Sequence, residues 1–117
     1  MAGMRYEKRV RSRLSVRFGQ EDLANIGFTE DISEHGIFLK TARVFPVNSE
    51  IRVELTTDED QTVRFVGEVK CSKEVAPNLV WSDCDAGMGI QIRRFVAGRE
   101  FFDQLLISGA SPGIRKN

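Results

Sequence analysis

The chain has 117 residues and a formal net charge of zero, and 41% of its residues are hydrophobic. This length supports one domain with a single modest core, and the composition is that of a folded protein rather than a disordered one. A balanced charge also argues against a dedicated binder of duplex DNA, whose surface is normally strongly basic.

The basic residues are concentrated near the N-terminus. Residues 5–17 hold six of the seventeen basic groups and one acidic group, so the rest of the chain is acidic. No apolar stretch follows them as it would in a signal peptide, and no run approaches the roughly eighteen apolar residues of a membrane span. We therefore expect a cytoplasmic protein.

Two cysteines and one histidine limit the redox and metal chemistry of the chain. Cys71 and Cys84 lie thirteen residues apart without a CxxC spacing, which favours free thiols in a reducing cytosol. His35 is the only histidine, so neither a structural zinc site nor a Ser-His-Asp or Cys-His arrangement is easily assembled. We expect no metal site and no enzymatic activity.

Alternation of apolar and polar residues predicts strands along most of the chain. The apolar positions of the six predicted strands are Leu14, Val16 and Phe18; Ile26 and Phe28; Ile37, Phe38 and Leu39; Ile51, Val53 and Leu55; Val63, Phe65, Gly67 and Val69; and Met88, Ile90 and Ile92. Only Phe101, Phe102, Leu105 and Leu106 have helical spacing, and Gly109 is placed to end that helix. These elements predict a small antiparallel barrel or sandwich with a C-terminal helix at one end.

Two short patterns carry the functional signal. Arg9 and Arg13 lie four residues apart, and eighteen residues after Arg13 begins a turn-like segment with Asp31, Ser33 and Gly36. An anionic guanine nucleotide requires arginine forks, and a carboxylate that accepts from its N–H groups or holds an arginine in place. The glycine allows close backbone approach or a positive φ. Either pattern alone is also explained by a basic edge strand or an ordinary Asx turn. We expect the arginine segment to be a wrapping coil.

Together, Arg-x-x-x-Arg and Asp-x-Ser-x-x-Gly resemble the signature of PilZ domains, receptors for the bacterial second messenger cyclic di-GMP. The glycine-flanked segment Gly87–Ile92 resembles the last strand of these domains. The resemblance implies a mainly β fold, a six-stranded antiparallel β-barrel with a C-terminal α-helix. It implies a single domain over residues 1–117, with a core of about 7–107 and a flexible tail over 108–117. The ligand-binding residues that it implies are Arg9, Arg13, Asp31, Ser33 and Gly36, with Lys8 as an additional candidate.

The resemblance implies a non-enzymatic cyclic di-GMP receptor that needs no cofactor. Its arginine segment is expected to change conformation on binding and to signal to an effector protein that the sequence does not identify. Two alternatives stay open: a PilZ-like interaction module of motility or envelope machinery that binds no nucleotide, and a barrel that binds single-stranded nucleic acid. The latter would need exposed aromatics for base stacking, whereas most of the eight phenylalanines fall on apolar faces. Trp81 fits the core, the ligand site or a partner contact.

Overall fold

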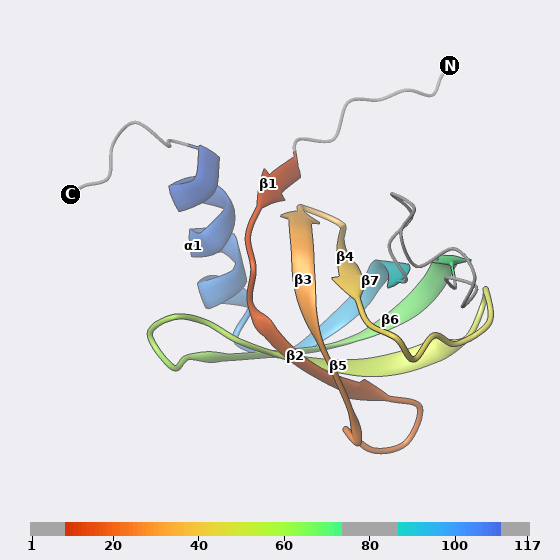
Figure 1. Ribbon diagram of the computed structural model, residues 1–117. Helices are drawn as coiled ribbons and strands as arrows, with labels where there is room; N and C mark the ends of the chain where they lie inside the picture. Colours follow the sequence, from red (N-terminus) through yellow and green to blue (C-terminus); the bar gives the residue numbers. More distant parts are fainter. Residues whose placement is uncertain (1–8, 74–86, 111–117) are drawn as a thin grey trace.

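The structure, a computed structural model, describes residues 9–73 and 87–110 of the chain. Its elements are β1 (Arg9–Arg11), β2 (Ser15–Gly19), β3 (Asn25–Ser33), β4 (Gly36–Lys40), β5 (Glu50–Thr56), β6 (Thr62–Lys73), β7 (Gly87–Ala97) and α1 (Arg99–Ala110) (Figure 1). The strands follow the period-two pattern of the sequence. In β5, for example, Ile51 and Val53 are buried and Arg52 between them is exposed, because successive side chains of a strand point to opposite faces.

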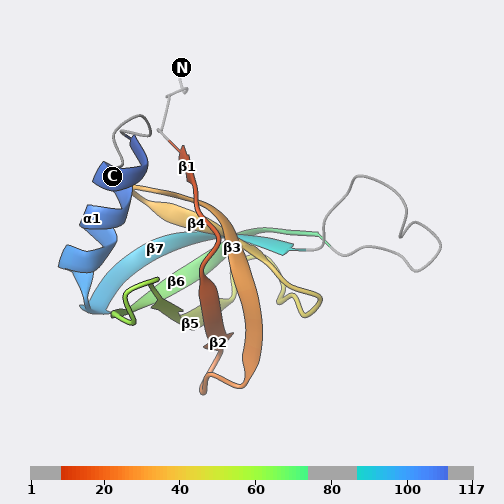
Figure 2. The same ribbon diagram turned by 60° about the vertical axis from the view of Figure 1, so that its left-hand side comes forward.

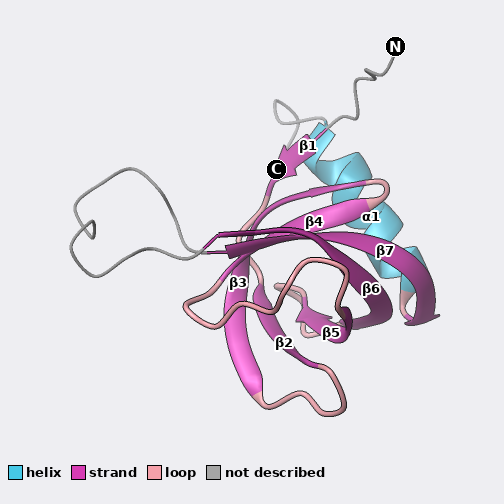
Figure 3. Ribbon diagram, turned by 90° about the vertical axis from the view of Figure 1, so that its right-hand side faces the viewer, coloured by secondary structure: helices cyan, strands magenta, loops and turns pink. Residues whose placement is uncertain are grey.

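The strands close into a barrel. The sheet order is β1-β3-β2-β5-β6-β7-β4, and β3 also pairs with β4. Strands β2 to β7 therefore form a closed ring of antiparallel pairs, with α1 at one side of it (Figure 3). This confirms the predicted six-stranded antiparallel β-barrel with one C-terminal helix.

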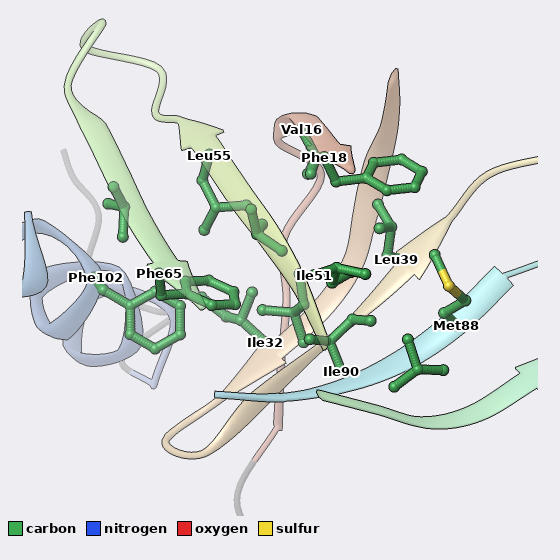
Figure 4. Close-up of a cluster of buried hydrophobic side chains, with 14 of the residues drawn as sticks. Val16, Phe18, Ile32, Leu39, Ile51, Leu55, Phe65, Met88, Ile90 and Phe102 are labelled. Carbon is green, nitrogen blue, oxygen red and sulfur yellow. The ribbon is translucent and has the colours of Figure 1, made fainter. Parts of the chain in front are cut away.

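The barrel interior is filled by apolar side chains from all six strands of the ring and from α1 (Figure 4). The helix contributes Phe102, whose ring lies 6.4 Å from that of Phe65 and 5.4 Å from that of Phe95 between centroids. Burying a phenylalanine side chain stabilises a fold by roughly 1.5–3 kcal/mol. The apolar stripe of α1 is therefore part of the core, as its helical spacing predicts.

One predicted strand has its apolar residues on the outside. In β3, Ile26 and Phe28 are 74% and 43% exposed, whereas Gly27 and Thr29 between and after them are buried. The hydroxyl of Thr29 accepts a hydrogen bond from Leu14 N–H at 2.9 Å, so this polar side chain is satisfied inside the protein. Because Thr29 faces the interior, Phe28 before it faces the surface, which is the opposite of what the apolar alternation predicts.

One predicted boundary and one predicted conformation are wrong. Helix α1 continues to Ala110, so Gly109 lies in its last turn, and the helix extends into the segment predicted as a tail from residue 108. The segment Arg9–Arg11 is a short strand rather than a wrapping coil. It pairs with β3 because the end of β3 runs past its pairing with β2, which stops at Phe28. Strand β1 lies between β3 and α1 and contacts both (Figures 1 and 2).

The described ranges do not include the additional ligand-binding candidate Lys8, nor Trp81 and Cys84. Cys71 is a free, exposed cysteine. No helix in the described part of the chain is long and apolar enough to cross a membrane. Within residues 9–73 and 87–110, no three His, Cys, Asp or Glu side chains gather as they would around a metal ion.

Candidate ligand-binding site

Strand β1 brings the two sequence patterns together. Its register pairs Arg9 with Ser33 and Arg11 with Asp31, although the residues of each pair are twenty or more positions apart in the sequence. Val10 between the two arginines is 8% exposed and belongs to the core cluster. The buried valine anchors β1, so that the arginines on either side of it face outward along β3.

Arg9 is held by both polar residues of the second pattern. Its Nε and Nη2 atoms lie 2.8 and 2.7 Å from Asp31 Oδ1, and its Nη1 donates to Ser33 Oγ at 3.5 Å. The Ser33 hydroxyl in turn donates to the carbonyl oxygen of Gly36 at 3.3 Å. In this structure, Asp31 therefore serves the second of its two expected uses, which is to hold an arginine in place.

Gly36 is required by the packing of the barrel. A Cβ atom at this position would lie 2.3 Å from the carbonyl oxygen of Ile90 in β7, closer than real contacts allow. Its backbone does not have a positive φ, since Gly98 is the glycine with that conformation among the described residues. The positive-φ interpretation of Gly36 is therefore wrong, and the close approach of β7 explains the glycine.

Arg13 occupies a different place from the other four candidate residues. It lies between β1 and β2, and its guanidinium carbon is 4.6 Å from the ring centroid of Phe28. It lines a depression of about 400 Å³ with Arg11, Phe28, Glu30 and Lys40. The structure thus brings Arg9, Asp31, Ser33 and Gly36 together, as expected, and places Arg13 beside them along β3 in a cation–π contact.

A second depression, of about 330 Å³, opens next to Arg9. Its polar lining comes from four strands and one turn: Arg9, Ser33, His35, Lys70 and Gln91. The strands β3, β4, β7 and β6 are successive neighbours at this place, because Ser33 pairs with Gly36, Gly36 with Gln91, and Gln91 with Glu68. The sequence patterns missed Lys70 and Gln91. Alternation along β6 indicates that Lys70 faces outward, but nothing local to β6 indicates that it faces Arg9.

The two depressions border the same strand, β3, and both are lined by basic side chains. The first contains a guanidinium stacked on an aromatic ring, and the second contains a guanidinium and an ammonium group together with Ser33, His35 and Gln91. Such surfaces attract anions, and they offer the planar face of a guanidinium for stacking together with hydrogen-bond donors. A planar, phosphate-containing ligand suits this combination of groups.

Comparison with known proteins agrees with this architecture. One similar solved structure is that of the Bacillus subtilis Inhibitor of motility (MotI/DgrA), with a TM-score of 0.74 and 17% sequence identity. The match covers 97% of this chain but 55% of that one, so the chain spans about half the length of that protein. No curated protein sequence matches the chain. The family model of the PilZ domain matches residues 4–98, and the chain therefore belongs to the PilZ domain family.

Proposed function

We propose that this protein is a non-enzymatic receptor for cyclic di-GMP, in which Arg9, Arg13, Asp31, Ser33 and Gly36 form the binding site. A single observation carries the proposal. Arg9 of the first pattern lies against Asp31 and Ser33 of the second, at 2.7–2.8 Å from the carboxylate. Two patterns that are distant in sequence thus converge on one exposed edge of the barrel, where membership of a receptor family leads one to look for a ligand.

The chemistry of the ligand matches the donors at this edge. Cyclic di-GMP carries two phosphate charges and two guanine rings, whose O6 and N7 atoms accept hydrogen bonds from an arginine fork. The face of a guanidinium also stacks on a planar base. Arg9 is 43% exposed at its side chain, and Arg13 lies at the surface over Phe28. Both guanidinium groups are thus accessible to a ligand that approaches β3 from outside.

Signalling follows from the position of β1. The strand is three residues long, and it lies between β3, which carries the second pattern, and α1 at the end of the barrel. A ligand that pulls Arg9 and Arg13 towards itself changes the conformation of this segment and partly neutralises its charge. We infer that an effector protein detects this change, with a coupling free energy of about 1–3 kcal/mol, as is usual between two binding sites.

Titration calorimetry tests the proposal directly. The protein is titrated with cyclic di-GMP, GTP and single-stranded RNA at physiological salt. We expect binding of cyclic di-GMP alone, with a dissociation constant between about 0.1 and 10 µM. Absence of heat and of any thermal shift with cyclic di-GMP would favour the interaction module that binds no nucleotide, since Arg9 already has a protein carboxylate as partner. Preferential binding of RNA would favour the nucleic-acid-binding barrel.

The effector is tested by affinity capture from the source bacterium with immobilised protein, with and without cyclic di-GMP. The proposal predicts at least one protein whose captured amount changes with the ligand. Identical captured proteins in identical amounts would contradict the signalling step but not the binding step, which the titration measures separately.

A further inference from the structure

A basic residue outside both sequence patterns lines the depression next to Arg9. Lys70 belongs to β6, which is separated from β3 by β7 and β4 along the barrel wall. Arg9 and Lys70 thus reach the same depression from strands on opposite sides of it. The side chain of Lys70 is 51% exposed, so its ammonium group is accessible to a ligand.

A β-bulge places Lys70 at this position. The pairing of β6 with β7 joins Val69 to Ile90 and Cys71 to Gly89, and it skips Lys70. A residue inserted in this way bends its strand and increases the local twist. Bulges are frequent next to functional sites for this reason. Lys70 keeps the outward orientation that alternation along β6 indicates, since Val69 before it is buried, and the bulge bends the strand at this residue.

Lys70 shares a carboxylate with a second basic residue. Its Nζ lies 3.6 Å from Glu68 Oε2, while Arg93 of β7 donates to Glu68 Oε1. Arg93 is likewise skipped in the pairing, which joins Val66 to Arg94 and Gly67 to Ile92. The Arg93 guanidinium lowers the pKa of Glu68 below its ordinary value, and Lys70 adds a smaller effect in the same direction. Glu68 is thus ionised at neutral pH, and Arg93 is its closer partner.

From this arrangement we propose that Lys70 is a phosphate-contacting residue of the ligand site and that Arg93 is a positioning residue that keeps Glu68 from retaining it. This inference rests on the proposed function. An ammonium group is a compact point charge with three donors, which suits a phosphate oxygen, whereas the planar fork of Arg9 suits a guanine edge or a second phosphate. A ligand with two separated phosphates, such as a cyclic dinucleotide, is then held from both sides of the depression.

The test compares Lys70→Ala with Arg43→Ala in calorimetric titrations of the whole protein with cyclic di-GMP. Arg43 is an exposed basic residue of the segment after β4 that lines neither depression, so its loss changes the net charge equally. We expect Lys70→Ala to weaken binding about 5- to 20-fold, and Arg43→Ala to change it less than about twofold. The affinity of Lys70→Ala should also depend less on salt concentration, because one ionic contact to the ligand is gone.

Two further variants test the role of Arg93. Glu68→Gln frees Lys70 and should tighten binding about two- to fivefold, whereas Arg93→Ala leaves Lys70 as the partner of Glu68 and should weaken binding by a similar factor. In a Lys70→Ala background, neither change should alter the affinity, since both act through the lysine. Equal effects in both backgrounds would show that Arg93 does not act through Lys70.

The controls separate failure of this inference from failure of the proposed function. If the unsubstituted protein binds cyclic di-GMP and Lys70→Ala binds it equally well, the inference is overturned and the proposed function stands. If the unsubstituted protein does not bind cyclic di-GMP, both are overturned. Thermal unfolding of each variant shows whether it is folded, and a weakened affinity in a variant of unchanged melting temperature supports a direct contact.

Discussion

The two arginines of the first pattern are held in different ways, although only three residues separate them. Arg9 belongs to β1 and donates to the carboxylate of Asp31 and the hydroxyl of Ser33. Arg13 lies beyond the end of β1 and stacks over the ring of Phe28 at 4.6 Å. One guanidinium is thus held at its edge by an opposite charge, and the other at its face by an aromatic ring.

This difference decides what each arginine contributes when a ligand arrives. The ligand must compete with Asp31 for the donors of Arg9, or accept hydrogen bonds from its other N–H groups. Arg13 donates no hydrogen bond within the described residues, and stacking occupies one of its faces only. Stacking therefore orients Arg13 before the ligand binds without using its N–H donors, which lowers the entropy lost on binding. Arg9 is also oriented before binding, but by an ion pair with Asp31 that the ligand must weaken.

The largest expected effect tests whether the two arginines are equivalent once the ligand is bound. Arg9→Ala and Arg13→Ala should each weaken binding of cyclic di-GMP by about 2–4 kcal/mol, because each leaves acceptors of the ligand unpaired. Titration calorimetry measures both losses. A much smaller loss for Arg9 than for Arg13 would show that the Asp31 pair persists in the complex and that Arg9 is a structural residue.

The next effect concerns the backbone that connects the two arginines. Thr29 is 1% exposed, accepts a hydrogen bond from Leu14 N–H at 2.9 Å, and donates to the carbonyl oxygen of Ser12. Thr29→Val keeps the shape of the side chain but leaves these groups unsatisfied, which should lower the free energy of unfolding by about 1–3 kcal/mol.

Chemical denaturation of Thr29→Val measures that loss, with Thr62→Val as the control. Thr62 is an exposed residue of β6, and its substitution should change the stability by less than about 0.5 kcal/mol. If Thr29→Val is as stable as the control, the segment between Arg9 and Arg13 is not fixed by this side chain, and the separate positions of the two arginines need another cause.

A smaller effect tests the stacking of Arg13. Phe28→Leu keeps an apolar side chain on the outer face of β3 but removes the ring beneath the guanidinium. We expect it to weaken binding of cyclic di-GMP by about 0.5–1 kcal/mol, the usual contribution of an exposed cation–π contact. The same titrations measure the change. Tighter binding would mean that Arg13 must leave Phe28 to reach the ligand, so that stacking on Phe28 would oppose binding rather than favour it.

Much of the fold could be predicted from the sequence because its determinants are local. Apolar residues at every second position, as in Ile51, Val53 and Leu55, indicate a strand with one buried face, and the structure buries all three. The helical spacing of Phe101, Phe102, Leu105 and Leu106 likewise indicates helix α1. The alternation does not predict the exposure of Phe28, because that exposure depends on Thr29, whose buried hydroxyl accepts a hydrogen bond from Leu14, fifteen residues earlier.

The candidate site shows the same division. Arg9, Asp31, Ser33 and Gly36 could be expected to meet because the resemblance links them, and the structure brings them together. The position of Lys70 follows from a bulge, which depends on the register between β6 and β7. No pattern within β6 encodes that register. The location of Arg13 over Phe28 likewise depends on where β1 ends and on the outward orientation of β3.

The smallest expected effect completes the comparison, since it concerns the arginine between the other two. Arg11 is 79% exposed at its side chain, and its Nη2 lies 4.0 Å from Glu30 Oε2. An ion pair this exposed contributes little. Arg11 pairs with Asp31 through the backbone of β1 and β3, but the carboxylate of Asp31 binds the guanidinium of Arg9, and the ring of Phe28 stacks with that of Arg13. Arg11→Ala should therefore weaken binding of cyclic di-GMP by less than about 1 kcal/mol, and its unfolding free energy should stay within about 0.5 kcal/mol of the unsubstituted protein. Because Arg11 lines the same depression as Arg13, this variant separates a specific contact from general positive charge. If Arg11→Ala weakens binding as much as Arg13→Ala does, the affinity depends on the total charge of the segment, and the assignment of distinct roles to Arg9 and Arg13 is wrong.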